Sequence, residues 1–292
     1  MKKIILLVVL FLCTLEGFSS TWEAAAAYRG SSEFYQASLS LRKQWSLLFF
    51  TGLEARFTDE KIFKDPIYSI YVPLEWESDI FKLHIRPFYY VKNKSHEEGY
   101  QDASAVGVTG HFIMTLQQDG VDDMSAHAYI GASFVRQKGT LFLDEGTYEN
   151  RSYDEVAYTL GLHKNFFDAF GFEIFGNGFQ YPDGITGVAG FRGILDQRDL
   201  AESPSLDLTH ELGKYNVGAR LTRLWTGVRP SSLYIGYRFA EFYSAEPEHS
   251  FLLGNTFFVT SNITADLAYN HLRTIHDHNK RDIFYARLRF LF

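Results

Sequence analysis

The sequence predicts an all-β protein, a transmembrane up-and-down antiparallel β-barrel of about fourteen strands. Its last twelve residues, 281–292, place Phe284 and Leu288 on one face of a strand and Arg287 and Arg289 on the other. One apolar and one charged face suit a wall between lipid and a wet lumen. Aromatic residues make up 17% of the chain. Beyond the first dozen residues, no apolar stretch approaches the ~20 residues that a membrane helix requires.

The N-terminus predicts export. Two lysines precede a short apolar run that ends at Leu12, and small and polar residues follow. This pattern is typical of a secretory signal peptide, here residues 1–19, which leaves 20–292 as the barrel. Cys13 is a poor lipidation site because the bulky Leu12 precedes it. The exported part then contains no cysteine, and we expect neither a disulfide nor a thiol nucleophile.

Polar and apolar residues alternate along most of the chain, and turn residues interrupt the alternation. In residues 81–92, for example, Leu83 and Ile85 oppose Lys82 and His84. The pattern predicts strands near residues 22–29, 34–42, 46–57, 66–76, 81–92, 102–116, 125–138, 153–163, 171–181, 215–225, 233–243, 249–259, 263–272 and 281–292. Sixteen or twelve strands are the alternatives.

The connections alternate in length. Bacterial barrels have short periplasmic turns and longer extracellular loops. With a periplasmic N-terminus, the predicted periplasmic turns include 43–45, 77–80 and 260–262, and the predicted outer loops include 139–152 and 182–214. All four tryptophans then fall at the periplasmic ends of strands, where an aromatic girdle belongs; they are Trp22, Trp45, Trp76 and Trp225.

The segment 182–214 is the longest predicted connection and has two interpretations. It begins with the turn sequence Pro182-Asp183-Gly184 and continues with glycines at every third residue. We expect a long extracellular loop that folds over or into the barrel mouth, because its apolar residues would otherwise form an exposed patch. Two further strands in this segment would instead give sixteen.

Candidate catalytic and metal-binding residues are few. Ser125-Ala126-His127 places a serine and a histidine on the predicted lumen face, but the sequence shows no orienting acid. His276-Asp277-His278 could offer two imidazoles to a metal, although a solvated loop explains it better. No phosphate-binding glycine loop with a lysine and no zinc-binding cysteine pair occurs. We therefore predict no catalytic residues, no metal site and no cofactor.

Charged side chains gather on the predicted lumen face. Alternation places nine basic and five acidic side chains there, although the whole chain carries a net charge of −7. The residues that we expect to line the lumen are Arg56, Lys82, His84, Arg86, Arg220, Arg238, Arg287, Arg289, Glu54, Glu75, Glu173 and Asp266, with Arg29, Arg42 and Glu23 beside them. Such charges require water or partners. The alternative is cross-strand neutralisation, for example of Arg56 by Glu75 or of Arg289 by Glu23, which would leave little net field.

The signal peptide, the alternation, the loop lengths and the terminal I-F-Y-A-R-L-R-F-L-F together resemble the bacterial outer-membrane β-barrel superfamily. They indicate no subfamily. The resemblance implies a location in the outer membrane, contact with its lipid, and insertion by the barrel-assembly machinery. Phe290 and Phe292 would then form the assembly signal.

Function does not follow from such a fold. The Arg- and Lys-rich lumen favours a channel or facilitator for small solutes, with small anionic solutes as ligands. A sealed structural or interaction barrel is the first alternative, and a lipid-modifying enzyme of the outer membrane is the second. The negative net charge argues against nucleic-acid binding.

Overall fold

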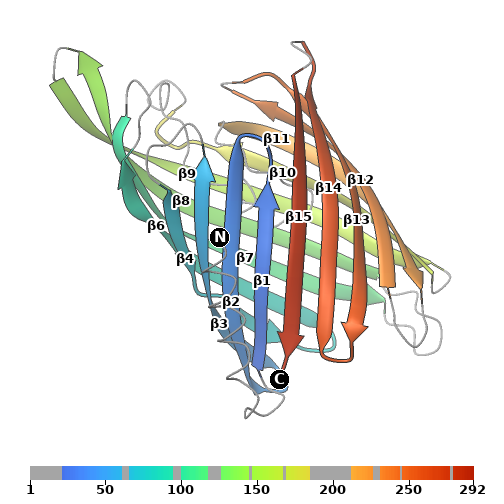
Figure 1. Ribbon diagram of the computed structural model, residues 1–292. Helices are drawn as coiled ribbons and strands as arrows, with labels where there is room; N and C mark the ends of the chain where they lie inside the picture. Colours follow the sequence, from blue (N-terminus) through green and yellow to red (C-terminus); the bar gives the residue numbers. More distant parts are fainter. Residues whose placement is uncertain are drawn as a thin grey trace.

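The computed structural model describes residues 22–60, 66–94, 100–117, 126–144, 147–166, 169–184, 212–225, 231–243, 245–276 and 279–292. These residues form fifteen β-strands in one antiparallel sheet (Figure 1). The sheet closes into a barrel because β1 (Trp22–Gly30) pairs with both β2 (Phe34–Ser46) and β15 (Lys280–Leu291). Among the described residues, no helix is long and apolar enough to cross a membrane.

The other strands follow one another around the wall in sequence order. They are β3 (Phe49–Glu60), β4 (Ile67–Tyr71), β5 (Leu74–Glu77), β6 (Phe81–Lys94), β7 (Tyr100–Gln117), β8 (Ala126–Asp144), β9 (Thr147–Phe166), β10 (Phe170–Gln180), β11 (Gly213–Trp225), β12 (Ser231–Phe242), β13 (Glu248–Thr260) and β14 (Ile263–Thr274). β4 and β5 share one position between β3 and β6, so the wall has fourteen positions. The prediction of fourteen strands is confirmed.

The break between β4 and β5 was not predicted. Pro73 lies there, and proline has no N–H with which to continue a ladder of hydrogen bonds. The backbone is nevertheless satisfied: Gly52 N–H donates to Pro73 O (2.9 Å), and Val72 N–H donates to Pro87 O (3.0 Å). The proline therefore interrupts the strand without opening the wall.

Two predicted connections were wrong. Of the loop predicted at 139–152, residues 139–144 and 147–152 instead form the ends of β8 and β9, which pair as far as Asp144 and Thr147. In Figure 1 this green hairpin extends well beyond the neighbouring strands. The turn predicted at 43–45 lies instead at Leu47–Leu48, because β2 continues to Ser46.

The segment 182–214 is described only at its ends. Pro182–Gly184 form the expected turn, in which Gly184 adopts a φ of 76° that favours glycine. The predicted fold of 185–211 over the barrel mouth lies outside the described residues. Because β10 pairs directly with β11, no further strand lies between them in the wall. The sixteen-strand alternative is therefore wrong.

The two barrel faces follow the predicted alternation. On β15, Phe284 (59% exposed) and Leu288 (45%) point outward, whereas Ile283 is 2% exposed. Outward side chains of the other strands are likewise mostly large and apolar, such as Leu160 (63%) and Ile130 (57%). This outer surface suits contact with lipid acyl chains.

We call the end of the barrel that holds Trp22 and Phe292 the terminal end, and the opposite end the far end. Trp22 N–H donates to Phe292 O (3.2 Å), and Phe292 N–H donates to Trp22 O (2.9 Å), which closes the barrel at this end. Trp45, Trp76 and Trp225 also lie toward the terminal end, all of them exposed. The Lys43 ammonium lies 4.2 Å from the Trp45 ring centroid.

Inward aromatic and histidine rings lie over glycines of the next strand. Each such glycine is the direct cross-strand partner of its ring, and a Cβ added to it would overlap the ring. The pairs are Phe88 with Gly107, His111 with Gly131, Tyr129 with Gly161, Phe175 with Gly218, and Tyr234 with Gly254. The glycines thus let large rings lie flat against the inner wall.

Candidate functional site

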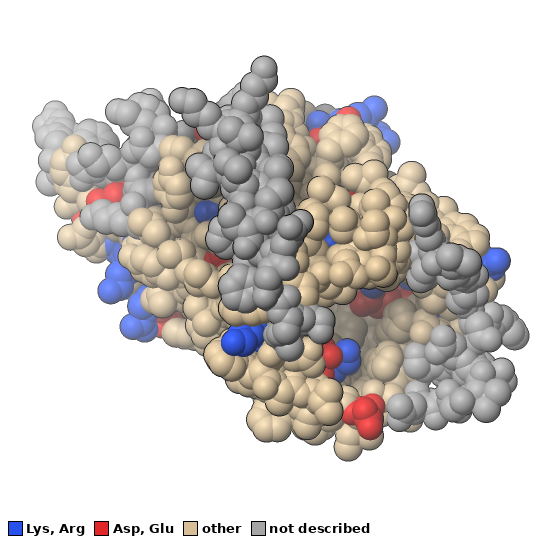
Figure 2. All heavy atoms as spheres, turned by 60° about the horizontal axis from the view of Figure 1, so that its bottom comes forward, with Lys and Arg blue, Asp and Glu red and all other residues tan. Residues whose placement is uncertain are grey.

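The candidate site is a cavity of about 340 Å³ on the inner wall, against strands β15, β1, β2, β3, β5 and β6. Arg29, Arg42, Arg56, Arg86 and Arg287 line it, together with Glu54, Glu75, Glu77 and His84. Five arginines against three glutamates leave an excess of positive charge. Figure 2, in which the terminal end is turned forward, shows a hollow that contains both basic and acidic side chains.

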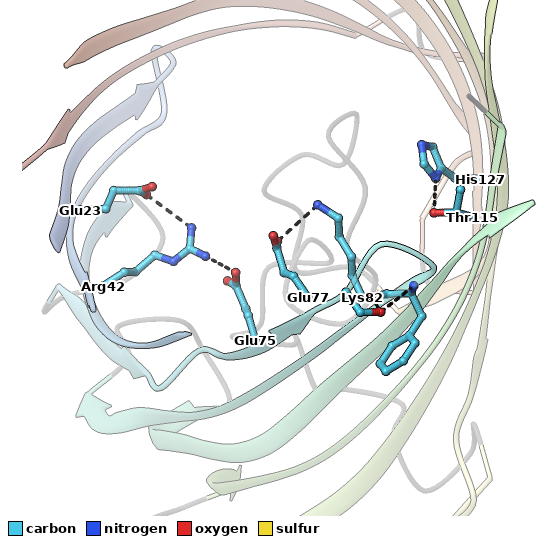
Figure 3. Close-up of polar contacts among 9 residues, drawn as sticks. Glu23, Arg42, Glu75, Glu77, Lys82, Thr115 and His127 are labelled. Carbon is cyan, nitrogen blue, oxygen red and sulfur yellow. Dashed lines mark hydrogen bonds and ion pairs between the residues drawn. The ribbon is translucent and has the colours of Figure 1, made fainter. Parts of the chain in front are cut away.

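Arg42 connects three strands at this site. Its guanidinium forms ion pairs with Glu23 Oε1 of β1 (3.4 Å) and with Glu75 Oε2 of β5 (Figure 3). Gly52 lies directly opposite Arg42 on β3, and a Cβ there would come within 2.9 Å of the Arg42 Cγ. The missing side chain therefore allows Arg42 to pass over β3 and reach Glu75.

The structure pairs these charges differently from the sequence-based expectation. Arg56 Nε lies 2.6 Å from Glu54 Oε1 on its own strand, because Glu75 is held by Arg42. The Arg56–Glu75 pair, an example of the neutralisation alternative, is therefore replaced by Arg56–Glu54 and Arg42–Glu75. The expected contact of Arg289 with Glu23 is present at 4.0 Å, and Arg289 lies equally far from Asp266.

Tyr71 positions two of the arginines. The Arg56 and Arg86 guanidinium carbons lie 4.1 and 5.1 Å from the centroid of the Tyr71 ring, within the range of cation–π attraction. Arg56 Nη1 also donates to the Tyr71 hydroxyl (3.3 Å), which donates to the Tyr90 hydroxyl (3.0 Å). Tyr71 is wholly buried, so it is a rigid support for both cations.

Arg287 differs from Arg42 and Arg56. It lines the cavity from β15, beside Tyr285. Within the described part of the chain, no acidic side chain lies within ion-pair distance of it. Its direct cross-strand neighbour on β14 is Asp266, which lies within ion-pair distance of Arg289 instead (4.0 Å).

Lys82 and His127 lie on the inner face toward the terminal end (Figure 3). Lys82 Nζ is 3.4 Å from Glu77 Oε1, with both side chains partly exposed. His127 Nδ1 is 3.4 Å from Thr115 Oγ1, and its ring stacks on that of His163 with centroids 6.2 Å apart. Ser125, the expected partner of His127, lies outside the described residues.

Glu75, Glu77 and His84 bring three possible metal-ligand atoms within 4.8 Å of one another. The sequence reasoning missed this cluster because it assigned Glu77 to a turn. Arg42 and Lys82 already neutralise the two carboxylates, so they compete with any cation. Of the predicted His276-Asp277-His278 cluster, only His276 is described; its backbone N–H donates to Glu246 (3.2 Å).

Two other predicted charges form pairs farther along the wall. Arg220 lies 2.8 Å from Glu173, which also accepts a hydrogen bond from the Tyr129 hydroxyl (2.8 Å). Arg238 is wholly buried and lies 3.0 Å from Glu248. The sequence reasoning missed Glu248 because β13 begins one residue earlier than predicted.

The inward charge is more balanced than the sequence predicts. Among the described residues, Glu77, Glu155 and Glu248 add three acidic side chains to the inner face, and Arg281 adds one basic side chain. Inward ion pairs lie both at the cavity and along β10–β15. The cavity lining itself still holds five arginines against three glutamates.

The fold is shared with solved outer-membrane barrels. CdiB from Acinetobacter baumannii aligns with a TM-score of 0.52 and 8% identity over 93% of this chain and 60% of its own. The CymD monoaromatic hydrocarbon channel aligns with a TM-score of 0.50 and 9% identity, over 97% of this chain and 92% of its own. The NanC porin aligns with a TM-score of 0.44 and 9% identity, over 93% of this chain and 100% of its own. No protein-family model and no curated protein matches the sequence.

The chain therefore has the fold of outer-membrane β-barrel proteins. At these identities the likeness extends to the fold alone, and substrate and selectivity have to be argued from the chain's own residues.

Proposed function

We propose that the protein is an outer-membrane channel or facilitator for small solutes that prefers anions. The observation that carries the proposal is the inner-wall cavity, where five arginines face three glutamates. The predicted signal peptide and the apolar outer wall support a location in the outer membrane. Assembly would then proceed through the barrel-assembly machinery, which would recognise the strand end at Phe290 and Phe292.

Anion preference follows from the electrostatics of a narrow, low-dielectric bore. Charged rings on the wall set selectivity in pores of this kind. At about 0.15 M salt the screening length is about 8 Å, so wall charges act across a bore of similar width. Arg42 and Arg56 are largely neutralised by their glutamates, whereas Arg287 retains most of its field. We therefore propose Arg287 as the main determinant of selectivity.

The experiment is a reversal-potential measurement in planar bilayers under a salt gradient. The wild type should prefer anions, and Arg287→Gln should move the reversal potential toward zero. Arg223→Gln is the matched control, because Arg223 lies on the outer wall, 4.3 Å from the Phe170 ring. Cation preference in the wild type, or equal shifts in both variants, would refute the proposed selectivity.

A sealed structural or interaction barrel is the second candidate. Two inward polar side chains on β11 and β12, Asn216 and Arg238, are wholly buried. The Asn177 amide donates through Nδ2 to Asn216 Oδ1 (2.6 Å), and its Oδ1 accepts from the Thr159 hydroxyl (2.8 Å). These buried side chains are hydrogen-bonded to one another across three strands, which supports a lumen that side chains fill in this part. A barrel without conductance would favour this candidate.

A further inference from the structure

A row of basic side chains crosses the outer wall at the far end. His249, Arg273 and Lys280 are direct cross-strand neighbours on β13, β14 and β15. Arg273 and Lys280 are exposed, and Lys280 has no ion-pair partner among the described residues. The alternation of these strands points all three away from the lumen, so the cavity described above does not explain them.

Aromatic and apolar side chains lie directly below this row, toward the terminal end. Phe251 is two residues from His249 and 51% exposed, and Leu253 (49%) follows on the same face. The Tyr237 ring lies 5.3 Å from that of Phe251, and the Tyr237 hydroxyl lies 2.7 Å from His249 Nδ1. Cations therefore stand above an apolar surface that continues down the wall.

The two layers enclose a groove. Its volume is about 340 Å³, and Tyr237, His249, Phe251, Arg273, Thr274 and Ile275 line it. Nearby Asp282 is already engaged, since the Tyr269 hydroxyl donates to it and His271 Nδ1 lies 2.7 Å from the same oxygen. Arg273 lines the groove and Lys280 is its direct cross-strand neighbour, so a cationic edge adjoins an apolar surface there.

We propose that this groove binds a phosphorylated lipid of the outer leaflet. Arg273 and Lys280 would bind the phosphate, because guanidinium and ammonium groups form strong charge-assisted hydrogen bonds with it. Tyr237 and Phe251 would carry the first carbons of an acyl chain, which continues over Leu253. With the predicted periplasmic N-terminus, the far end would face outside and the cations would lie at the headgroup level of that leaflet. The site is independent of whether the barrel conducts.

Native mass spectrometry of the full-length protein in detergent tests the proposal, with bisphosphorylated lipid A as the probe. The wild type should retain the lipid, and Arg273→Gln with Lys280→Gln should weaken its binding at least tenfold. Arg223→Gln, an outer-wall change toward the terminal end, should leave binding unchanged. A detergent-resistant, heat-modifiable band for each variant shows that it is folded.

Two further probes identify the source of the recognised group. Dephosphorylated lipid A should bind at least tenfold more weakly than the intact lipid, and inorganic phosphate up to ~10 mM should not displace it. Equal binding with and without phosphate, displacement by free phosphate, or equal loss in the Arg223→Gln control would each overturn the lipid site.

Discussion

The rings that lie over glycines make one sharp prediction about stability. Gly161 lies opposite Tyr129, and a Cβ at Gly161 would overlap the ring. The ring is not free to turn away, because its hydroxyl donates to Glu173 (2.8 Å). Gly161→Ala should therefore either overpack the inner wall or break this hydrogen bond.

Two numbers bound the cost. Overpacking a well-packed site costs about 1–3 kcal/mol. Loss of a hydrogen bond to a charged group costs about 1.5–3 kcal/mol, and the partly exposed Tyr129 should lie at the lower end. We expect Gly161→Ala to destabilise the barrel by about 2 kcal/mol.

Denaturant unfolding in lipid vesicles of fixed composition measures this cost. Gly236→Ala is the matched control on the inner face, because the nearest atom to its Cβ would be Leu252 Cβ at an ordinary 3.4 Å. The control should be as stable as the wild type, or up to about 1 kcal/mol more stable. In the Tyr129→Ala background, Gly161→Ala should cost little. Equal stability of the two glycine variants, or the same cost with and without the ring, would refute the reasoning.

Three other predictions concern the wall and its charges. Leu288→Arg puts a cation into the lipid and should lower the free energy of unfolding by roughly 2–4 kcal/mol in the same assay. Arg287→Leu on the inner face should fold normally, and the opposite order of stabilities would show that the two faces are misassigned. Deleting residues 290–292 should lower the outer-membrane level of the protein on membrane-fraction blots, and a normal level would show that this end is not the assembly signal. Arg42→Leu should move the reversal potential toward cation preference because it exposes two carboxylates, and an unchanged potential would mean that these charges do not face the ion path.

The sequence predicted the wall because lipid enforces the pattern. A strand with lipid on one side and water or polar groups on the other must alternate, and a slip of one residue would turn every side chain to the wrong face. All fourteen wall positions were therefore predictable. The ends of β8 and β9 pair beyond the neighbouring strands (Figure 1), where no such constraint sets the pattern, so residues 139–152 were predicted as a loop.

The partners of the inward charges were harder to predict. Alternation indicates which face a side chain occupies, but not which neighbour it reaches. Arg42 finds Glu75 because Gly52 leaves room above β3, and Arg56 then takes Glu54. Such choices depend on strand tilt, curvature and side-chain volume, which no single strand encodes.

The central claim is that the lumen conducts small solutes. Single-channel recording of the refolded, detergent-purified protein in a planar bilayer tests it most directly. A conducting, anion-selective barrel should give discrete steps of current. Arg287→Gln should reduce the anion selectivity of these channels but leave the frequency of their insertion unchanged. A barrel that inserts, as shown by its heat-modifiable band from the same vesicles, yet gives no steps would contradict the claim and identify a sealed cylinder.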